Sequence, residues 1–327
     1  MKIKKILITG SYGYIGKCLF SYLKNKNYNV YGIDKAYRRN SDFEFKVNLN
    51  NKKILNKILS KIKPQIIIHL AGQSTIDGIY SKEKYELNNI RATKILIQSM
   101  RKYSITNIIF SSTASVYKNN NKSISENSEI FPSNVYSHTK LKSENLIKNS
   151  KDINYVIFRF FNVCSSIPKL NVGEFHSPET HLIPITVNKI IKEKKIRVYG
   201  NNFKTKDGTC IRDYIHIEDL CIAFEKTIKS FFNKNIINNV FNLGSGKSFT
   251  ILEVIKNACK IILPIKKNKD FLFVKRRKGD LDKLLCNYKK AKKFLGWTPV
   301  NSYLKKIIED EFIWQKKNLK KRRLFIY

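Results

Sequence analysis

Residues 8–16 read ITGSYGYIG, a glycine triplet with the spacing G-x-x-G-x-x-G. The residues before it, 3–8, are mostly apolar, as expected for a strand that is buried on both faces. After it, Leu19, Tyr22 and Leu23 continue an apolar pattern at helical spacing. A strand, a glycine turn and a helix in this order are typical of dinucleotide-binding folds. We therefore predict an α/β fold with a doubly wound parallel (Rossmann) sheet and a smaller α/β substrate-binding domain.

Each glycine of the triplet has a separate physical task in such a turn. Gly10 permits the tight turn, Gly13 lets backbone N–H groups approach a pyrophosphate, and Gly16 lets the helix pack close to the strand. The phosphates would then lie at the positive end of the helix dipole. The alternative is a plain glycine-rich turn, because a triplet alone is not specific.

A carboxylate follows the next expected strand, residues 29–33. Asp34 lies about twenty residues beyond the glycines, where an acidic side chain accepts hydrogen bonds from the adenosine ribose. It would repel a 2′-phosphate, so the sequence favours NAD over NADP. Lys35, Arg38 and Arg39 are close in sequence and weaken this preference. The alternative reading of Asp34 is a turn residue.

Further strand–helix units are expected, with helices at residues 52–61 and 83–103 and strands at residues 65–70 and 107–110. The strand at residues 65–70 is followed by Ala71 and Gly72, small residues that let backbone lie against a flat ligand. Hydroxyl residues 111–113 follow the strand at residues 107–110, and at the carboxyl end of a parallel strand they point into the ligand crevice. A helix N-cap or a turn is the alternative for these hydroxyls.

Tyr136 and Lys140 are four residues apart, so on a helix they share a face. A tyrosine with a pKa of about 10 is not a base at neutral pH. Lowering its pKa by about three units takes roughly 4 kcal/mol, which an ammonium about 4 Å away supplies at an effective dielectric of about 20. The pair therefore predicts a proton-transfer device. The alternative is two residues on a solvated helix.

The composition of the 327-residue chain allows two domains, and the net charge of +38 is unusual. This charge is compatible with a binder of nucleic acid or of an anionic surface. It is also compatible with a general bias in composition, because Lys, Asn and Ile are abundant together. The lysines are dispersed and show no stripe interleaved with aromatic residues, which favours the second reading.

Other sequence features bear on location and on ligands. Six cysteines without a C-x-x-C pair indicate buried thiols in a reducing cytosol. The apolar run after the basic N-terminus is too short for a signal core, so we expect a cytoplasmic protein without membrane spans. The five histidines lack H-x-x-x-H spacing, and no metal site is predicted. Residues 244–248 resemble the end of a P-loop, but Phe241 replaces its first glycine, so a tight turn is expected there.

Taken together, the motifs resemble the extended short-chain dehydrogenase/reductases and, within them, the UDP-glucose 4-epimerase family. The matching stretches cover nearly the whole chain: ITGSYGYIG, IIIHLAG, NNIRAT, FSSTASVY, VYSHTK, RFFN, GEFHSPETHLIP, DGTCIRDYIHIEDL, FNLGSGKS, RRKGD and FLGWTP. GEFHSPETHLIP (residues 173–184) and the DGTCIRDYIH block (residues 207–216) are the most specific of them.

The resemblance implies an NAD-dependent isomerase that interconverts UDP-glucose and UDP-galactose through a 4-keto intermediate, without net oxidation. Tyr136 would be the catalytic base, Lys140 its partner, and Thr113 the residue that binds the sugar 4-hydroxyl. A UDP-N-acetylglucosamine or UDP-pentose 4-epimerase stays open, as does a sugar-nucleotide dehydratase. Ala114 and Ser115 after Thr113 argue against the dehydratase, which needs an acid–base pair there. A basic nucleic-acid-binding protein without catalysis is the alternative from another class.

The resemblance also implies the residues of both binding sites. Those for NAD are Gly10, Gly13, Tyr14, Ile15, Gly16, Asp34, Asn48, Leu49, Leu70, Ala71, Gly72, Asn88, Lys140 and Phe161. Those for the UDP-sugar are Thr113, Tyr136, Asn162, His181, Leu182, Arg212, Arg277, Asp280 and Leu284. Three positions depart from the family pattern: Asn48 replaces an acidic residue, Ser74 a frequent lysine and Val135 a proline.

Finally, the resemblance implies a division of the chain and an assembly. Residues 1–165 would form the NAD-binding domain, with segments around 210–245 returning to it. Residues 166–327 would mainly bind the UDP-sugar. A homodimer is expected, because family members are commonly dimers.

Overall fold

The computed structural model describes residues 4–37, 39–74, 80–118, 122–176, 179–233, 237–264, 270–276 and 282–324. Within them, the largest element is a seven-stranded sheet with the order β13-β6-β5-β4-β1-β2-β3. Its strands are β1 (Lys5–Thr9), β2 (Asn29–Asp34), β3 (Glu44–Lys46), β4 (Ile66–His69), β5 (Asn107–Thr113), β6 (Asn154–Phe160) and β13 (Asn239–Leu243). All neighbouring pairs in this sheet are parallel.

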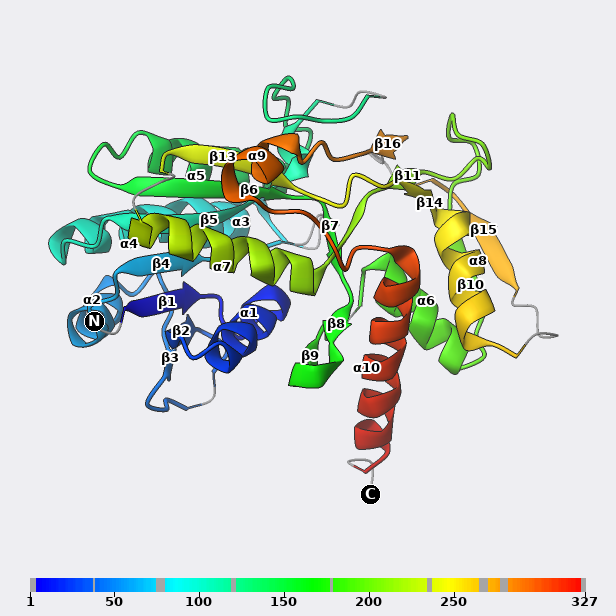
Figure 1. Cartoon of the computed structure of the whole chain (residues 1–327), viewed down its shortest axis with the longest axis horizontal. Helices are drawn as coiled ribbons and strands as arrows, with labels where there is room; N and C mark the ends of the chain where they lie inside the picture. The colour runs from blue at the N-terminus through cyan, green and yellow to red at the C-terminus, as the bar shows by residue number, and fades with distance from the viewer. Residues whose placement is uncertain are drawn as a thin grey trace.

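Helices cover both faces of this sheet (Figure 1). On one face α1 (Tyr14–Asn25) packs against α7 (Ile217–Asn233), and on the other α4 (Ala92–Lys102) packs between α2 (Lys52–Ile62) and α5 (Val135–Lys148). The alternation of β1 explains this arrangement. Ile6 and Ile8 belong to the core under α1 and α7, whereas Leu7 belongs to the core under α2 and α4. The predicted doubly wound Rossmann fold is confirmed.

The strand order reverses between β1 and β4, since the chain first builds outward from β1 to β2 and β3 and then resumes on its other side. In doubly wound sheets, the crevice at such a switch point, beyond the carboxyl ends of the strands, is the usual place for a ligand. The residues that follow β1 and β4 are the glycine turn and residues 70–72. The topology therefore brings two of the predicted cofactor segments to one place.

The helix predicted over residues 83–103 is present but not uniform. It comprises α3 (Lys82–Tyr85), a π-helical segment η1 (Glu86–Arg91) and α4. The π-turn carries the buried side chain of Asn89, which bonds to groups of two other segments. Such π-turns inside helices are frequently found at functional sites.

The second half of the chain adds a smaller group of elements. Helices α6 (Leu182–Ile191), α8 (Ile251–Ile262) and α10 (Leu304–Leu324) pack on one another, on the side away from the large sheet (Figure 1). The short strands are β7 (Asn162–Cys164), β8 (Ser166–Ile167), β9 (Val172–Gly173), β10 (Ile196–Tyr199), β11 (Ile211–Arg212), β12 (Tyr214–His216), β14 (Phe249–Thr250), β15 (Phe271–Val274) and β16 (Lys283–Leu284). The short helices are η2 (Ala114–Val116), η3 (Pro168–Leu170) and α9 (Lys289–Leu295).

Asp219 of α7 fastens the C-terminal part of the chain to the large sheet. Its backbone carbonyl accepts a hydrogen bond from Trp297 Nε1 at 2.9 Å, and its carboxylate accepts bonds from Asn301 N at 2.8 Å and Ser302 Oγ at 2.6 Å. β13 likewise returns to the large sheet beside β6. The proposed domain division at residue 165 stays a prediction.

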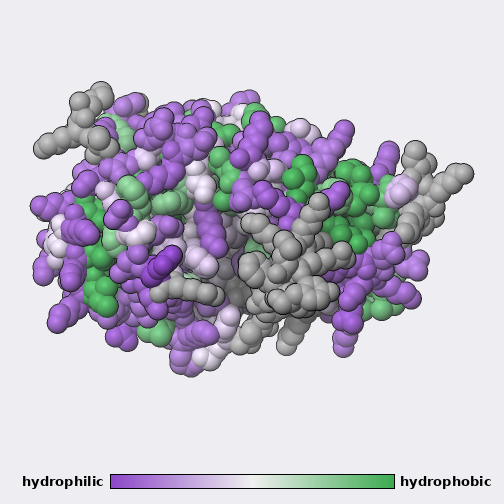
Figure 2. All heavy atoms as spheres, turned by 90° about the horizontal axis from the view of Figure 1, so that it is seen from below, coloured by the Kyte–Doolittle hydropathy of each residue, from purple (hydrophilic) through white to green (hydrophobic). Residues whose placement is uncertain are grey.

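The surface, the cysteines and the helices can be compared with the expectations of a charged chain with buried thiols and no membrane span. Hydrophilic residues cover most of the face in Figure 2, with separate hydrophobic patches among them. All six cysteines are free thiols, and five of them are buried. No helix in the described parts of the chain is both long and apolar enough to cross a bilayer.

Candidate active site

The glycine turn is tight enough to require glycine at two positions. Gly10 has a φ of +72°, and a Cβ there would lie 2.6 Å from the backbone nitrogen of Ala71. A Cβ on Gly16 would lie 2.1 Å from the carbonyl oxygen of Gly10. The end of β1, the start of α1 and the segment after β4 therefore approach at backbone distance. Thr9 closes this contact, because its Oγ1 accepts a hydrogen bond from Ala71 N at 3.2 Å.

The N-terminus of α1 and the carboxylate at the end of β2 fit a dinucleotide. Gly13 is the N-cap of α1 and provides no side-chain cap, so the first turn keeps backbone N–H groups for an anion. Asp34 accepts hydrogen bonds from Tyr12 N at 3.1 Å and Ala36 N at 2.9 Å. These bonds fix the carboxylate, which is half-buried, and leave lone pairs for ribose hydroxyls.

The other predicted cofactor residues differ in burial and in their hydrogen bonds. Leu49 and Phe161 are buried, and Asn48 is exposed. The hydroxyl of Tyr14 donates to the carbonyl of Ser165 at 2.6 Å, which links α1 to the segment after β7. Asn88 is half-buried and donates from Nδ2 to Lys84 O at 3.0 Å. The half-buried Ile15 and Leu70 pack against the core under α1 and α7. Their contact with NAD stays a prediction.

Asn89, which was not among the predicted site residues, connects the cofactor side to the catalytic helix. Its Oδ1 accepts from Gln73 N at 2.7 Å, and its Nδ2 donates to Thr139 Oγ1 at 2.8 Å. Thr139 in turn donates to the carbonyl of Tyr136 at 2.8 Å. One buried amide therefore ties the segment after β4 to the first turn of α5. The NNIRAT motif contained this residue, but its partners are distant in sequence and could not be read from it.

The first turn of α5 carries Tyr136. Asn134 caps the helix: its Oδ1 accepts from Ser137 N at 2.8 Å, and Ser137 Oγ accepts from Asn134 N at 3.3 Å. Val135 is the first helical residue and Tyr136 the second. A negative charge on the phenol would therefore lie at the positive end of the helix dipole, a favourable position.

Thr113 ends β5 and faces the phenol. Its hydroxyl donates to Ser115 Oγ at 3.1 Å and caps η2, accepting from Ser115 N at 3.1 Å. The N-cap reading of this hydroxyl is thus confirmed, and its contact with a sugar hydroxyl stays a prediction. Burial raises the pKa of Tyr136 to about 12, and the Thr113 hydroxyl opposes this rise.

Lys140 lies one turn further along α5 and is only 5% exposed. Its ammonium is 4.3 Å from the centre of the Phe110 ring. Burial lowers the pKa of Lys140 to about 7, and Glu144 opposes this fall. Our expectation that this ammonium lowers the pKa of Tyr136 is therefore wrong for the protein alone. Desolvation dominates at both groups and favours their neutral forms.

Three of the predicted substrate residues lie on paired short strands. Arg212 of β11 is in register with Leu284 of β16. Asn162 of β7 pairs with Tyr214 of β12, and its Nδ2 donates to the carbonyl of Asp213 at 2.8 Å. Asp213 separates β11 from β12, so it links these positions through the backbone. Phe161, at the carboxyl end of β6, precedes Asn162 directly.

The remaining predicted substrate residues fall in two segments. His181 is the N-cap of α6 and Leu182 its first residue. Burial alone would lower the pKa of His181, but hydrogen bonds to Glu174 and Glu179 raise it to about 10. Arg277 and Asp280 lie outside the described residues.

The P-loop-like segment after β13 is a turn held by a carboxylate. Asp213 accepts hydrogen bonds from Ser245 N at 2.6 Å, Gly246 N at 2.9 Å and Cys286 N at 3.1 Å. Burial raises the pKa of Asp213 to about 6, against the effect of these bonds. The backbone donors that a phosphate would need are already used here. This agrees with the expected tight turn.

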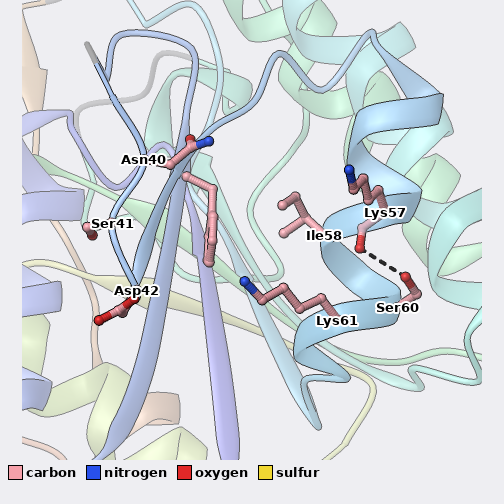
Figure 3. A pocket seen from close by; sticks show the side chains of 8 residues that line it. Asn40, Ser41, Asp42, Lys57, Ile58, Ser60 and Lys61 are labelled. Atoms are coloured by element: carbon pink, nitrogen blue, oxygen red, sulfur yellow. Dashed lines mark hydrogen bonds between the residues drawn. The ribbon is translucent and has the colours of Figure 1, made fainter.

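A surface hollow between residues 40–45 and α2 contains none of the predicted site residues (Figure 3). Asn40 and Asp42 line one side of it, and Lys57, Ile58 and Lys61 of α2 line the other. It lies at the β3 edge of the large sheet, whereas Thr113 lies at the end of β5. Predicted site residues lie instead around the carboxyl ends of β1, β4 and β5.

The parallel sheet, the helix N-terminus with backbone N–H groups for an anion and the phenol lie at the same end of the fold. These features define the class of dinucleotide-dependent Rossmann enzymes. The chain is a member of the NAD dependent epimerase/dehydratase family, whose profile matches residues 6–244. This confirms the resemblance stated from the motifs.

Individual relatives are similar over nearly the whole chain. The UDP-glucose 4-epimerase of Halalkalibacterium halodurans is 31% identical over 326 residues, which cover 96% of each chain. A crystal structure of a UDP-glucose 4-epimerase is 31% identical, with a TM-score of 0.89 over 97% of this chain and 98% of that chain. The Bifidobacterium longum UDP-glucose 4-epimerase, crystallised with NAD+ and UDP, is 27% identical, with a TM-score of 0.86 over 97% of this chain and 99% of that chain.

Proposed function

We propose that the protein catalyses the NAD-dependent 4-epimerisation of UDP-sugars, with UDP-glucose and UDP-galactose as its first substrates. The observation that carries this proposal is the placement of Tyr136, at the start of α5, beside Thr113, at the carboxyl end of β5, where the Thr113 hydroxyl acts to lower the pKa of the phenol. Two hydroxyls there can orient a sugar hydroxyl and take its proton, beside a turn that fits a dinucleotide. The named relatives with the same fold support this reaction.

NAD would be held by the glycine turn, by Asp34 and by residues 70–72, and it would supply hydride transfer at the sugar C4 and a positive charge. Tyr136 takes the proton of the 4-hydroxyl, and Thr113 orients that hydroxyl. Because the pKa of Tyr136 is about 12 in the protein alone, bringing it near 7 takes roughly 7 kcal/mol of added preference for the phenolate. The positive charge of bound NAD and the dipole of α5 would supply part of this.

The substrate would be anchored by its UDP end while the sugar stays free to turn. Arg212 and Arg277 offer guanidinium forks suited to a diphosphate, and Asn162, His181, Leu182 and Asp280 complete the anchor. The 4-keto sugar rotates about this anchor, so that the hydride returns to its other face. The reaction is redox-neutral, and binding energy from the UDP end keeps the intermediate in place.

The assay that tests the proposal follows conversion of UDP-galactose to UDP-glucose by the purified protein. We expect Tyr136→Phe to lower kcat about 10²- to 10⁴-fold, because it removes the proton acceptor. Tyr303→Phe is the matched control, because Tyr303 is exposed and lies outside the site. A Tyr136→Phe variant as active as the parent would remove Tyr136 from the mechanism, and no turnover of any UDP-hexose would refute the function.

The same assay with UDP-N-acetylglucosamine and UDP-pentoses decides the range of sugars. In the family, the residue at the position of Leu284 helps to set the width of the sugar pocket. Leucine is of middling size, so N-acetylated sugars and UDP-pentoses both stay open as substrates. Loss of water from the product would indicate a dehydratase instead.

We also propose a homodimer in a reducing, cytoplasmic setting. The six free thiols support the reducing setting, because disulfides form in oxidising compartments. The dimer is carried over from the family resemblance, and sedimentation of the purified protein tests it.

A further inference from the structure

Two Glu-x-His pairs come together between β9 and α6. Glu174 and His176 form the first pair, and Glu179 and His181 form the second. The potential ligand atoms of these four residues all lie within 4.8 Å of one another. These four residues form the Glu-His cluster. The spacing of the histidines along the sequence, which predicts no metal site, does not reveal it.

The distances within the Glu-His cluster match a tetrahedral ion. His176 Nδ1 lies 3.0 Å from Glu174 Oε1 and 3.9 Å from Glu179 Oε2, and His181 Nδ1 lies 3.6 Å from Glu179 Oε1. His181 Nδ1 also contacts Glu174 Oε1. Ligand atoms at zinc bond lengths of about 2.0–2.1 Å are roughly 3.3 Å apart around a tetrahedron. The observed separations bracket this value.

A buried carboxylate oxygen in the cluster has no partner. The Glu174 side chain is 0% exposed, and its Oε2 forms no hydrogen bond among the described residues. A buried carboxylate oxygen without a donor is costly and needs an explanation. A cation held by both oxygens of this carboxylate would supply the missing partner.

Among the described residues, the carboxylates of the Glu-His cluster form no ion pair with a lysine or an arginine. Glu311 of α10 is fully buried, and its Oε2 is likewise unpartnered. Its carboxyl acts electrostatically on the same group of side chains, including Glu174 and His181. The described ion pairs of Glu174 and Glu179 are with the two histidines only, although the chain has 63 lysines and arginines. Two carboxylates thus meet two imidazoles at one place, near the Glu311 carboxyl, whose pKa is raised well above its usual value by burial.

The ligand groups are held in position by their surroundings. The carbonyl of Glu174 accepts from Trp314 Nε1 at 2.7 Å, and the carboxylate of Glu179 accepts from Thr180 N at 2.8 Å. The ring of Tyr14 meets the ring of His176 edge to face, with 6.4 Å between their centres. In metal sites, contacts of this kind with surrounding residues orient the side chains that bind the metal.

We propose that Glu174, His176, Glu179 and His181 bind one zinc ion in a closed, structural site. Two imidazole nitrogens and two carboxylate oxygens are a donor set that zinc accepts, and four protein ligands leave no open position for chemistry. The ion fastens its four ligand residues to one another and fixes His181 and Leu182 at the start of α6. His181 would then serve the substrate through its position and its second ring nitrogen.

The test uses the full-length protein, produced without a polyhistidine tag and dialysed to remove loosely held metal. We expect one zinc per chain by elemental analysis, and cobalt(II) in its place should give the visible bands of tetrahedral coordination. His176→Asn and Glu179→Gln each remove one ligand and should weaken zinc binding about 100-fold or more, measured by competition with a chromophoric chelator. His138→Asn is the control, because His138 is exposed and lies outside the cluster.

Two results would overturn the proposal. One is a wild-type protein that retains only trace zinc and gives an octahedral cobalt spectrum. The other is unchanged zinc stoichiometry and affinity in both ligand variants, which would assign the metal to another place on this basic chain. Should a variant fail to fold, the stoichiometry and the cobalt spectrum of the wild-type protein still decide the matter.

Discussion

Lys140 and Glu144 lie one turn apart on α5, and both are buried, yet their surroundings are opposite. Glu144 accepts hydrogen bonds from Arg159 Nη2 at 2.7 Å, Ser112 Oγ at 2.5 Å and Lys148 Nζ at 3.1 Å. Burial alone would raise the pKa of Glu144, but the bonds from Arg159 lower it below its usual value. The carboxylate therefore stays charged inside the protein.

Lys140 is surrounded instead by an aromatic ring and low-dielectric protein. Its ammonium lies over Phe110, and its pKa falls to about 7 because burial outweighs the attraction of Glu144. The protein itself matches the charge of Glu144 with Arg159, Ser112 and Lys148. We propose that the charge of Lys140 is instead matched by a bound ligand, as at functional sites.

The largest effect on stability is expected when the buried ion pair of Glu144 and Arg159 is removed. Glu144→Gln leaves the buried guanidinium of Arg159 without its carboxylate, and we expect a loss of about 3–5 kcal/mol in the free energy of unfolding. Denaturant titration of parent and variant measures this loss. The exposed ion pair of Arg101 and Asp152 provides the control, since Asp152→Asn should cost about 1 kcal/mol or less. A Glu144→Gln variant as stable as the parent would remove the distinction drawn here.

A smaller effect of opposite sign is expected at Lys140. Its pKa is about 7 in the folded protein and about 10.4 when unfolded, so the unfolded chain binds more protons between these values. Stability therefore rises with pH in this window, and below about pH 7 the cost of burying Lys140 is full. Lys140→Met removes that cost and should stabilise the nucleotide-free protein by a few kcal/mol at pH 7.

Unfolding titrations at pH 7 and pH 9.5 check this expectation. The gap between Lys140→Met and the parent should shrink at the higher pH, because the parent loses its penalty there. A gap that is constant with pH would mean that Lys140 is not the group responsible. The same variant should lose epimerase turnover, so stability and activity change in opposite directions.

The physical range of the interactions explains which features could be predicted from the sequence. The strand, glycine turn and helix at residues 5–25 were predictable, because apolar periodicity and a tight turn are local properties. The shared face of Tyr136 and Lys140 followed in the same way from helix geometry. Their pKa values did not, since these depend on burial under segments far away in the chain. The π-turn at Asn89 was missed for a related reason, as it depends on contacts with Gln73 and Thr139.

The Glu-His cluster was not predicted from the sequence either. The Glu-His cluster consists of two Glu-x-His pairs that become neighbours only through the path of the chain between β9 and α6. The search for a metal site used the spacing of histidines along a helix, which is the wrong geometry for this segment. Residues two apart in extended chain share a side, and that spacing was the available signal.

The contrast between Glu144 and Lys140 also holds for two adjacent residues of β5, Ser112 and Thr113. Substitutions of these two residues give the smallest expected effects. Ser112 donates to the matched carboxylate of Glu144, and the Thr113 hydroxyl acts to lower the pKa of Tyr136. We expect Ser112→Ala to lower the free energy of unfolding by about 1–2 kcal/mol and to leave turnover nearly unchanged. Thr113→Val keeps the shape of the side chain, and it should lower kcat about 10-fold or more with only a small change in stability. Denaturant titration and UDP-galactose turnover are measured for both variants. Ser112→Ala should mainly lower stability, and Thr113→Val should mainly lower turnover. Equal losses of stability with intact turnover in both would show that the two hydroxyls serve one structural network, and Thr113 would then have no part in the reaction.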